Sequence, residues 1–473
     1  MNLKFRYARK IMVASTLAFF LSGCAVTSVF MPYPKQASTI KQQIEAKQIQ
    51  LATDKLDKKR HGADKILYLM ERGRTAQIGN ESKISREDYL HAKEAISALE
   101  QKAVINASSA GSKAASLFTN DNAIPYVGES YEHVFLYHFQ AMNYLFDNDL
   151  QGALVEVRRA NEEQQLALRR HAKELDKLAK KKQKQQQPAN QKKSFMSAFS
   201  QLNSVSDRVK NSFQNAYTFY ASGVMWELEG KDNDAYIDYK KALEIFPDNP
   251  YLQVDVIRLA KSLGMREDLA RFKKQFKAKD VPPVSNGGEL IVFYEQGFAP
   301  VKEEIKVSIP THKGIHSVAF PTYSGKWKST PALTIRDISN NQALGATSPI
   351  VYVQALATKA LQEDLPGMLV RQVLRIVAKK EAADKAGEQL GTPGKIAATI
   401  FNIATERADL RSWLTLPNDA QIYRGVLAAG ERNIRIGDGS ASEVIAIKIV
   451  PGKKTILRVV GTGKTLHTRA ITL

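Results

Sequence analysis

A change of pattern near the middle of the chain constrains its fold more than any other feature. Residues 39–279 carry apolar side chains at helical spacing. Residues 280–288, with the sequence Asp-Val-Pro-Pro-Val-Ser-Asn-Gly-Gly, are typical of a linker. Beyond them come short runs in which apolar and polar residues alternate, as in 443–450. The sequence therefore predicts an α+β protein, with an all-helical domain at 39–279 followed by a β-rich domain at 289–473.

A helical insertion is expected inside the β-rich domain. Residues 349–407 are predicted to form a helical block, broken at Pro366-Gly367 and at Gly391-Thr392-Pro393-Gly394, because proline and glycine end helices. Strands are expected at 290–294, 304–309, 316–320, 332–336, 420–426, 432–436, 443–450, 455–460 and 466–472. The domain is therefore predicted to be a small sheet or sandwich that carries a helical subdomain.

Residues 1–23 have the features of a bacterial lipoprotein signal peptide. Four basic residues precede an apolar run at 11–21, which suits a signal peptide and is too short to span a membrane. The run ends in Leu21, Ser22, Gly23 and Cys24, and Cys24 is the only cysteine of the 473 residues. This ending resembles a lipobox, in which the cysteine sulfur receives diacylglycerol, the chain is cut before the cysteine, and the new amine is acylated. The alternative is an ordinary secretory signal that happens to contain a cysteine.

The lipobox predicts where the protein is located. Two or three acyl chains anchor a protein stably without a transmembrane helix. Residues 24–38, which include Pro32 and Pro34, are predicted to form a short tether. Ala25 stands where an aspartate would retain a lipoprotein at the inner membrane. The predicted location is therefore the periplasmic face of an outer membrane.

Charge and location together limit the expected partners. The 68 basic and 48 acidic residues give a net charge of +20, and cleavage of the signal peptide leaves about +16 (20 − 4). In the cytosol this charge would suggest nucleic acid, which a periplasmic protein does not meet. The expected partners are periplasmic or outer-membrane envelope proteins and anionic envelope polymers. With one cysteine, no cofactor is expected beyond the covalent diacylglycerol and N-acyl lipid on Cys24.

Two segments of the helical domain resemble tetratricopeptide repeats, a helix-pair motif of about 34 residues. The later segment places Phe219, Gly223, Trp226, Ala235, Tyr239, Ala242 and Pro247 at motif positions, and the earlier one places Tyr137, Ala141, Tyr144, Ala153, Val157 and Ala160 there. We expect Gly223 to face Ala235 where two helices touch, so that Gly223→Ala is mild. An insertion separates the repeats, and its lysine- and glutamine-rich part, 173–193, is predicted to be a protruding helix that frays into a flexible basic tip.

Asp409, Arg411 and Trp413 form a candidate ligand corner where the helical block returns to strands. In the structural interpretation Trp413 fills the junction and Asp409 pairs with Arg411 or caps a turn. In the functional interpretation, Trp413 stacks on a glycan or peptide and Arg411 forms a bidentate ion pair with a carboxylate. The structural interpretation is favoured, and the functional one stays open.

Two other patterns fall short of a functional motif. Gly461-Thr462-Gly463-Lys464-Thr465 is similar to the end of a phosphate-binding loop, but Arg458 stands at the position of the first glycine and no helix follows, so a β-turn is favoured. His312 and His316 lack a carboxylate or cysteine to complete a ligand set, so no metal site is predicted. No catalytic motif is present, and no catalytic residue is assigned.

The whole chain resembles an uncharacterised family of proteobacterial outer-membrane lipoproteins with tetratricopeptide-like N-terminal helices. The resemblance rests on the lipobox, Glu289–Glu295 with Pro300–Lys302, Asp364–Pro366 and, most distinctively, Ala408–Pro417. Genes of this family often neighbour that of a lipoprotein that activates a bifunctional penicillin-binding protein. The resemblance therefore implies cell-wall assembly by association, and it supplies no catalytic residue.

The sequence predicts a non-enzymatic adaptor or scaffold for cell-envelope proteins, among them those of peptidoglycan synthesis. Stacked helix pairs offer extended concave surfaces to such partners. Two alternatives remain open: an envelope glycan hydrolase and a glycan-binding module, each with its site in residues 289–473. Two convergent carboxylates in a cleft would favour the hydrolase. An aromatic-lined groove would favour the adaptor or the glycan-binding module.

Overall fold

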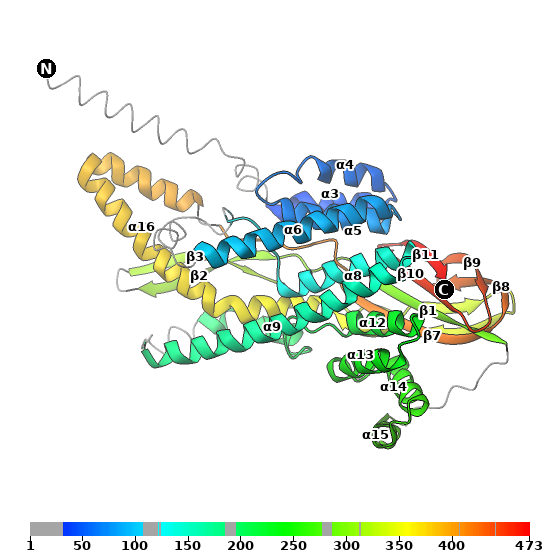
Figure 1. The fold of residues 1–473 in the computed structure, drawn as a ribbon. Coiled ribbons are helices and arrows are strands. Elements are labelled where there is room, and N and C mark those ends of the chain that lie inside the picture. The colour runs from blue at the N-terminus through cyan, green and yellow to red at the C-terminus, as the bar shows by residue number, and fades with distance from the viewer. Residues whose placement is uncertain are drawn as a thin grey trace.

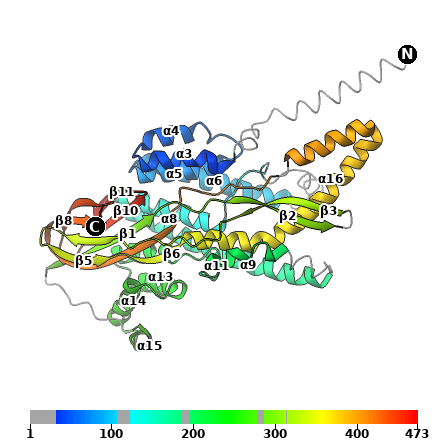
Figure 2. The ribbon, with the colours of Figure 1, turned by 180° about the vertical axis from the view of Figure 1, so that it is seen from behind.

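The computed structural model describes residues 32–106, 122, 124–184, 195–276, 286–311, 314–405, 407–439 and 441–473. The signal peptide with Cys24, most of the linker and the end of the basic stretch 173–193 lie outside these residues. The described chain is helical in its first half and rich in strands in its second half, as the change of pattern predicts. Figures 1 and 2 show an elongated molecule, with strands β1 and β7–β11 at one end and strands β2 and β3 toward the other.

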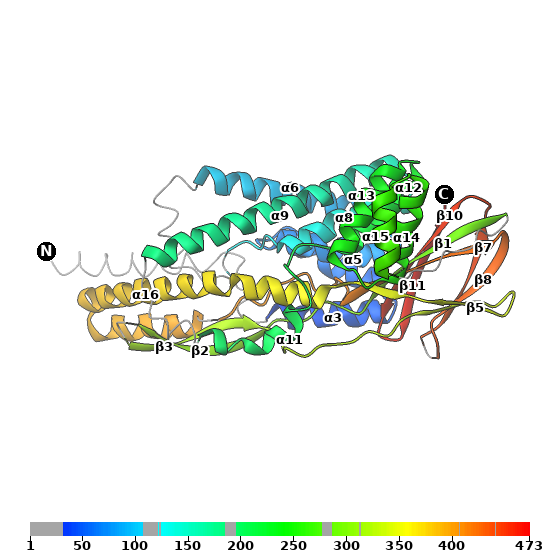
Figure 3. The same cartoon turned by 90° about the horizontal axis from the view of Figure 1, so that it is seen from below.

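The described part of the first half consists mainly of helices. Their bounds are α3 Tyr33–Glu45, α4 Ile49–Asp57, α5 Lys65–Ile78, α6 Ser82–Asn106, α8 Ser130–Phe146, α9 Leu150–Lys184, α11 Asn203–Ser206, α12 Ala216–Leu228, α13 Asp232–Ile245, α14 Pro250–Ser262 and α15 Arg266–Phe276, with a 3-10 turn at Ser200–Leu202. Figure 3 shows α6 and α9 extending away from the sheets, and α9 contains the start of the basic stretch. The predicted tether is shorter than expected, because α3 begins at Tyr33 with Pro34 in its first turn, where proline fits a helix.

Glycine–tyrosine contacts join two of the helix pairs. A Cβ atom on Gly223 of α12 would overlap the ring of Tyr239 of α13, and a Cβ on Gly73 of α5 would overlap the ring of Tyr89 of α6. Each tyrosine follows its glycine by sixteen residues (239 − 223 and 89 − 73). Gly223 therefore faces Tyr239, which corrects the expected contact with Ala235. The pair α5–α6 has the same spacing, although its sequence was not identified as a repeat.

Replacing Gly223 with alanine should therefore lower the free energy of unfolding by about 1–3 kcal/mol, which revises the mild effect expected from sequence. The Tyr239 ring is fully buried and must move to admit the methyl group. Gly62→Ala is the matched control, because its Cβ would meet only the backbone oxygen of Lys59, at 3.6 Å. Thermal melts compare the two variants. Equal melting temperatures would show that the α12–α13 contact is looser than described.

The second half forms two sheets, a two-stranded ribbon and one long helix. The strands are β1 Gly287–Gln296, β2 Glu303–Thr311, β3 Gly314–Thr322, β4 Thr334–Asp337, β5 Gln342–Ala346, β6 Ser348–Tyr352, β7 Asp419–Ala428, β8 Gly430–Ile436, β9 Glu443–Ile449, β10 Lys454–Thr462 and β11 Thr465–Thr472. The sheets have the orders β11-β10-β1-β7-β6 and β5-β4-β8-β9, and β2 pairs with β3. The central strand β1 is parallel to β10 and antiparallel to β7.

The helical block differs from its prediction at its start and at its expected breaks. Residues 348–352 form β6, and the helix α16 runs from Val353 to Thr405 through both proline-containing sequences. Figure 1 shows the last part of α16 (orange) turned back sharply from the yellow part. Strand β5 had no sequence prediction. Both β5 and β6 are short, and β6 begins with Ser-Pro, which weakens the alternation that identifies a strand.

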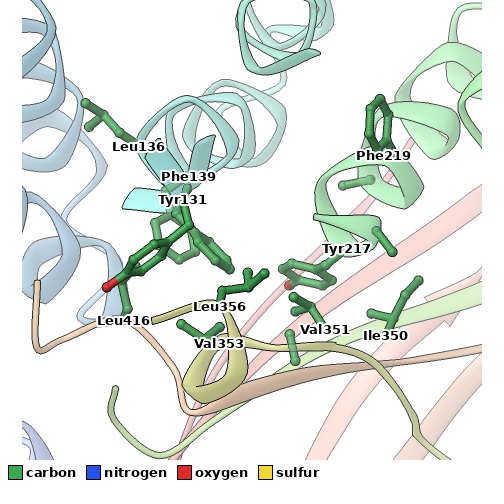
Figure 4. Close-up of a cluster of buried hydrophobic side chains, with 14 of the residues drawn as sticks. Tyr131, Leu136, Phe139, Tyr217, Phe219, Ile350, Val351, Val353, Leu356 and Leu416 are labelled. Carbon is green, nitrogen blue, oxygen red and sulfur yellow. The ribbon is translucent and has the colours of Figure 1, made fainter. Parts of the chain in front are cut away.

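Strand β1 has a different neighbour on each face. Leu290, Val292 and Tyr294 pack in a cluster with residues of the four-stranded sheet. Ile291 and Phe293 point to the opposite face and belong to a larger cluster that includes residues of the helices. Figure 4 shows part of that cluster, in which side chains of α8 and α12 meet those of β6, the start of α16 and Leu416. The helical half and the strand half therefore share one hydrophobic core.

Candidate functional site

Buried charges hold the helices on the five-stranded sheet. Glu295 of β1 forms an ion pair with Arg74 of α5, and both side chains are almost completely buried. Tyr217 of α12 donates its hydroxyl to the same carboxylate at 2.8 Å. Burial raises the pKa of Glu295, but the Arg74 and Arg458 guanidinium groups outweigh this effect and hold it below its ordinary value. Glu295 is therefore ionised and connects α5 and α12 to the sheet.

A second buried cluster lies further along the same sheet face. Arg424 of β7 lies 2.9 Å from Glu227 of α12 and 3.1 Å from Asp255 of α14. Glu289 of β1 lies 2.6 Å from the same guanidinium group. Burial lowers the pKa of Arg424, but the three carboxylates raise it well above its ordinary value. The sheet therefore covers the sides of α12 and α14 that carry these charges.

These contacts assign the predicted repeat residues to the interior. Ala141, Ala153, Phe219, Trp226, Ala235 and Tyr239 are buried, Tyr137 and Tyr144 are half-buried, and Pro247 is exposed. Where α5, α12 and α14 meet the sheet, this chain's own strands cover the helices. This part of the helix surface is therefore not open to a partner.

The residues Asp409, Arg411 and Trp413 lie together, but in a packed corner. Trp413 is fully buried and packs edge-on against aromatic rings of α6 and α8. Arg411 is 4% exposed and forms ion pairs with Asp409, at 2.7 Å, and with Asp64. Burial raises the pKa of Asp409, but Arg411 holds it below its ordinary value. Trp413 has no exposed ring face on which a glycan could stack.

Two helix carboxylates hold this corner, and sequence reasoning missed both. Glu71 of α5 accepts the backbone N–H groups of Leu414, at 2.7 Å, and Thr415, at 3.1 Å. Glu132 of α8 accepts the N–H of Trp413 at 2.8 Å. Burial raises the pKa of Glu71, although these donors oppose the shift. Because the partners are distant in sequence, no local pattern indicates these two glutamates.

A cavity of about 330 Å³ lies next to β6, an edge strand of the five-stranded sheet. Its apolar wall combines the end of α13, strand β6 and the start of α16, and its other wall is the loop 207–214 before α12. The lining residues are Asp207, Arg208, Val209, Lys210, Asn211, Gln214, Ala216, Ile245, Phe246, Ile350, Val351, Tyr352 and Leu356. The lining residues come from three separate parts of the chain, 207–216, 245–246 and 350–356, so no local sequence pattern indicates the cavity.

The loop 207–214 is held by its own hydrogen bonds and by α16. Asn211 accepts the backbone N–H of Gln214 at 2.9 Å, as turn-forming asparagines do. Ser212 donates its hydroxyl to Glu363 of α16 at 2.7 Å. Asn215 then caps α12 by accepting the N–H of Thr218 at 3.3 Å. These hydrogen bonds fix the loop 207–214, so this wall of the cavity is preformed.

Aromatic rings and a cation line the mouth of the cavity. Phe246 packs against Tyr352 with ring centroids 5.3 Å apart, and Tyr352 packs edge-on against Trp327 at 4.8 Å. The guanidinium group of Arg208 lies 3.8 Å from the centroid of the Trp327 ring. Trp327 and Tyr352 are half-buried, so both remain in contact with solvent. Phe246, Tyr352 and Arg208 therefore line the cavity, and Trp327 lies beside it against Tyr352.

The turn sequence 461–465 and His316 do not line the cavity. Thr462 pairs with Thr465 in the β10–β11 hairpin and Gly463 has a positive φ, so the predicted β-turn is confirmed. His316 lies on β3, and His312 is outside the described residues. Within the described ranges, no three His, Cys, Asp or Glu side chains gather as metal ligands, and no helix is long and apolar enough to cross a bilayer.

Comparison with known proteins does not identify the chain. No family model and no curated protein matches it. Two solved structures, titled "Crystal structure of MamA" and "Crystal structure of MamA protein", align at 10% identity. Each alignment covers 52% of this chain, with 92% and 96% of the other chain, at a TM-score of 0.27. This score is too low to carry an argument about fold or function.

Proposed function

We propose that this protein is a non-enzymatic adaptor of the cell envelope, anchored by lipid to the periplasmic face of the outer membrane. The cavity between the loop 207–214 and β6 is the observation that carries the proposal. It has an apolar wall, an aromatic and cationic mouth and a preformed loop, which are features of a binding site. Asp207 is the one carboxylate among its lining residues, whereas a glycan hydrolase ordinarily uses a pair.

In this proposal the helix pairs are tetratricopeptide-like repeats with an internal role. The glycine–tyrosine contacts at Gly73 and Gly223 and the buried motif residues support this interpretation. The repeats hold the five-stranded sheet through Glu295 and Arg424, and the envelope partner binds at the cavity on the outside. The resemblance to the lipoprotein family supports proteins of peptidoglycan synthesis as the class of partner.

The start of α3 supports a position close to the membrane. Tyr33 is nine residues from the proposed lipid-bearing Cys24 (33 − 24). Even a fully extended chain of this length reaches only about 30 Å. A lipid anchor would therefore keep the folded part within a short distance of the outer membrane.

Replacing Cys24 with alanine should release the protein from the membrane, because no other acylation site is proposed. Fractionation of cells into outer membrane and soluble periplasm, with mass spectrometry of the mature N-terminus, measures the effect. Ser28→Ala is the matched control and should stay in the outer-membrane fraction with its acyl chains. Normal processing and outer-membrane recovery of Cys24→Ala would contradict the lipid anchor.

Glycan binding is the second candidate function, and the half-buried Trp327 and Tyr352 favour it, since carbohydrates stack on aromatic rings. Arg208 covers one face of Trp327, which leaves less ring surface for stacking. We therefore rank the adaptor first. Sedimentation with purified peptidoglycan sacculi separates the two, because only a glycan-binding module should sediment with sacculi free of protein.

Affinity purification from solubilised envelopes tests the adaptor. Three versions of the full chain are compared: wild type, the double variant Arg208→Glu with Lys210→Glu, and the control Lys261→Glu on α14. We expect a co-purifying envelope protein that is lost with the double variant and retained with the control. Recovery of the same proteins with all three versions would contradict a partner site at the cavity.

A further inference from the structure

The exposed side chains around the cavity carry more positive than negative charge. Arg208 and Lys210 lie on its loop wall, and Lys326 and Lys328 flank Trp327 beside it; all four are exposed. The exposed acids are Asp207 on the loop and Asp248 close to Tyr352, so the exposed side chains alone carry about +2 (4 − 2). Two less exposed acids are also close, because Glu363 of α16 accepts the Ser212 hydroxyl and the buried Asp419 acts on Tyr352 and Lys328. Among the described residues, none of the four cations forms an ion pair.

The loop with Lys326 and Lys328 is fixed beside the cavity. Gln354, at the start of α16, accepts the backbone N–H of Lys328 at 3.1 Å and donates to its carbonyl oxygen at 2.7 Å. Gln354 follows Tyr352 closely, so the two lysines stay near the mouth. Exposed cations beside an apolar cavity that form no ion pair of their own attract an anionic ligand and add little desolvation cost.

The size of the cavity favours a side chain over a chain of sugars. A volume of about 330 Å³ is at the lower end of ligand pockets, which run from about 300 to 1,000 Å³. The half-buried side chains of Ile245, Phe246 and Tyr352 form an apolar wall, which suits an aliphatic or aromatic side chain. Binding of an oligosaccharide instead needs exposed aromatic ring faces with polar side chains around them. The Arg208 guanidinium group covers part of the Trp327 ring, which leaves less of that face exposed.

We propose that the cavity binds an acidic peptide segment of a partner protein, with one apolar side chain of that segment inserted against Ile245, Phe246 and Tyr352. Carboxylates on either side of the inserted residue pair with Arg208 and Lys210 on one wall and with Lys326 and Lys328 at the mouth. The proposal rests on the adaptor function and names the chemistry of the segment that the adaptor recognises. An apolar anchor with flanking charges is a common mode of segment recognition.

Fluorescence anisotropy with the full chain in detergent tests the proposal. The probe is a fluorescein-labelled peptide with one central leucine and glutamates on both sides. We expect binding that weakens at least about tenfold when the leucine is replaced by serine, and again when the glutamates are replaced by lysines. Raising the salt concentration should weaken binding by screening the exposed charges.

Protein variants locate the binding. The double variant Arg208→Glu with Lys210→Glu should weaken binding of the glutamate peptide at least about tenfold, whereas Lys261→Glu should leave it unchanged. Ile245→Ser tests the apolar wall separately and should weaken binding of the leucine peptide without altering its salt dependence. Equal binding of the lysine peptide, or equal binding by all variants, overturns the proposal.

Two further outcomes separate this inference from the adaptor function. Capture of an envelope protein that depends on Arg208 and Lys210, without binding of the glutamate peptide, would overturn the acidic segment and leave the adaptor standing. Binding of a soluble muropeptide that depends on Tyr352, with no binding of the glutamate peptide, would overturn the inference in favour of a glycan ligand. Binding of the peptide with the expected variant pattern supports the inference even if the lipid anchor fails its own test.

Discussion

Replacing Glu295 with leucine should lower the free energy of unfolding by about 3–5 kcal/mol. The change removes the carboxylate that pairs with Arg74 and accepts the Tyr217 hydroxyl. It leaves an uncompensated guanidinium group buried between α5 and the five-stranded sheet, which is the costly part of breaking a buried ion pair. Urea unfolding followed by circular dichroism measures the loss.

Two comparisons show whether the loss comes from the buried pair. Asp364→Ala breaks an ion pair with Arg371, at 3.0 Å, whose side chains are nearly half exposed, and it should cost less than about 1 kcal/mol. The double variant Arg74→Leu with Glu295→Leu should cost less than the sum of its single changes, since it does not leave the Arg74 guanidinium group buried without its carboxylate. Additive losses would show that the two groups do not depend on each other.

Replacing Trp413 with alanine should also lower the free energy of unfolding by about 3–5 kcal/mol. The indole is fully buried, with ring centroids 6.0 Å from Tyr89 and 5.8 Å from Phe139, and its Nε1–H donates to Thr415 at 3.0 Å. Its removal leaves a large cavity where the strand half meets α6 and α8. Thermal and urea melts measure the effect.

Trp327→Ala is the matched control for Trp413, because it removes the same side chain from a half-buried position. It should change the melting temperature little and should weaken binding at the cavity. The reverse result, with Trp413→Ala harmless to stability and damaging to binding, would support the functional interpretation of the Asp409–Arg411–Trp413 corner.

Local patterns were sufficient to predict the kinds of element and the order of the two halves. The strands expected at 432–436, 443–450, 455–460 and 466–472 correspond to β8, β9, β10 and β11. The prediction of the β10–β11 turn was also correct, because the turn needs a residue with a positive φ and Gly463 supplies it. Such features depend on residues close in sequence, where periodicity and turn chemistry act directly.

The arrangement of the two halves could not be predicted in the same way. Arg74 and Glu295 are 221 residues apart, and a single sequence holds no signal that they pair. The cavity likewise combines residues of α13, β6, α16 and the loop 207–214, which only the fold brings together. One missed signal was available, since Gly73 and Tyr89 have the spacing of Gly223 and Tyr239.

Photo-crosslinking in living cells tests most directly the central claim, that a partner protein binds at the cavity. A photoreactive amino acid replaces Lys210 on the cavity loop or, as control, Lys261 on α14, in otherwise native chains. The account predicts a discrete crosslinked product with an envelope protein at position 210, no such product at position 261, and loss of the product when Arg208→Glu is added. Equal products at both positions, or a product at position 210 that contains only glycan, would contradict it.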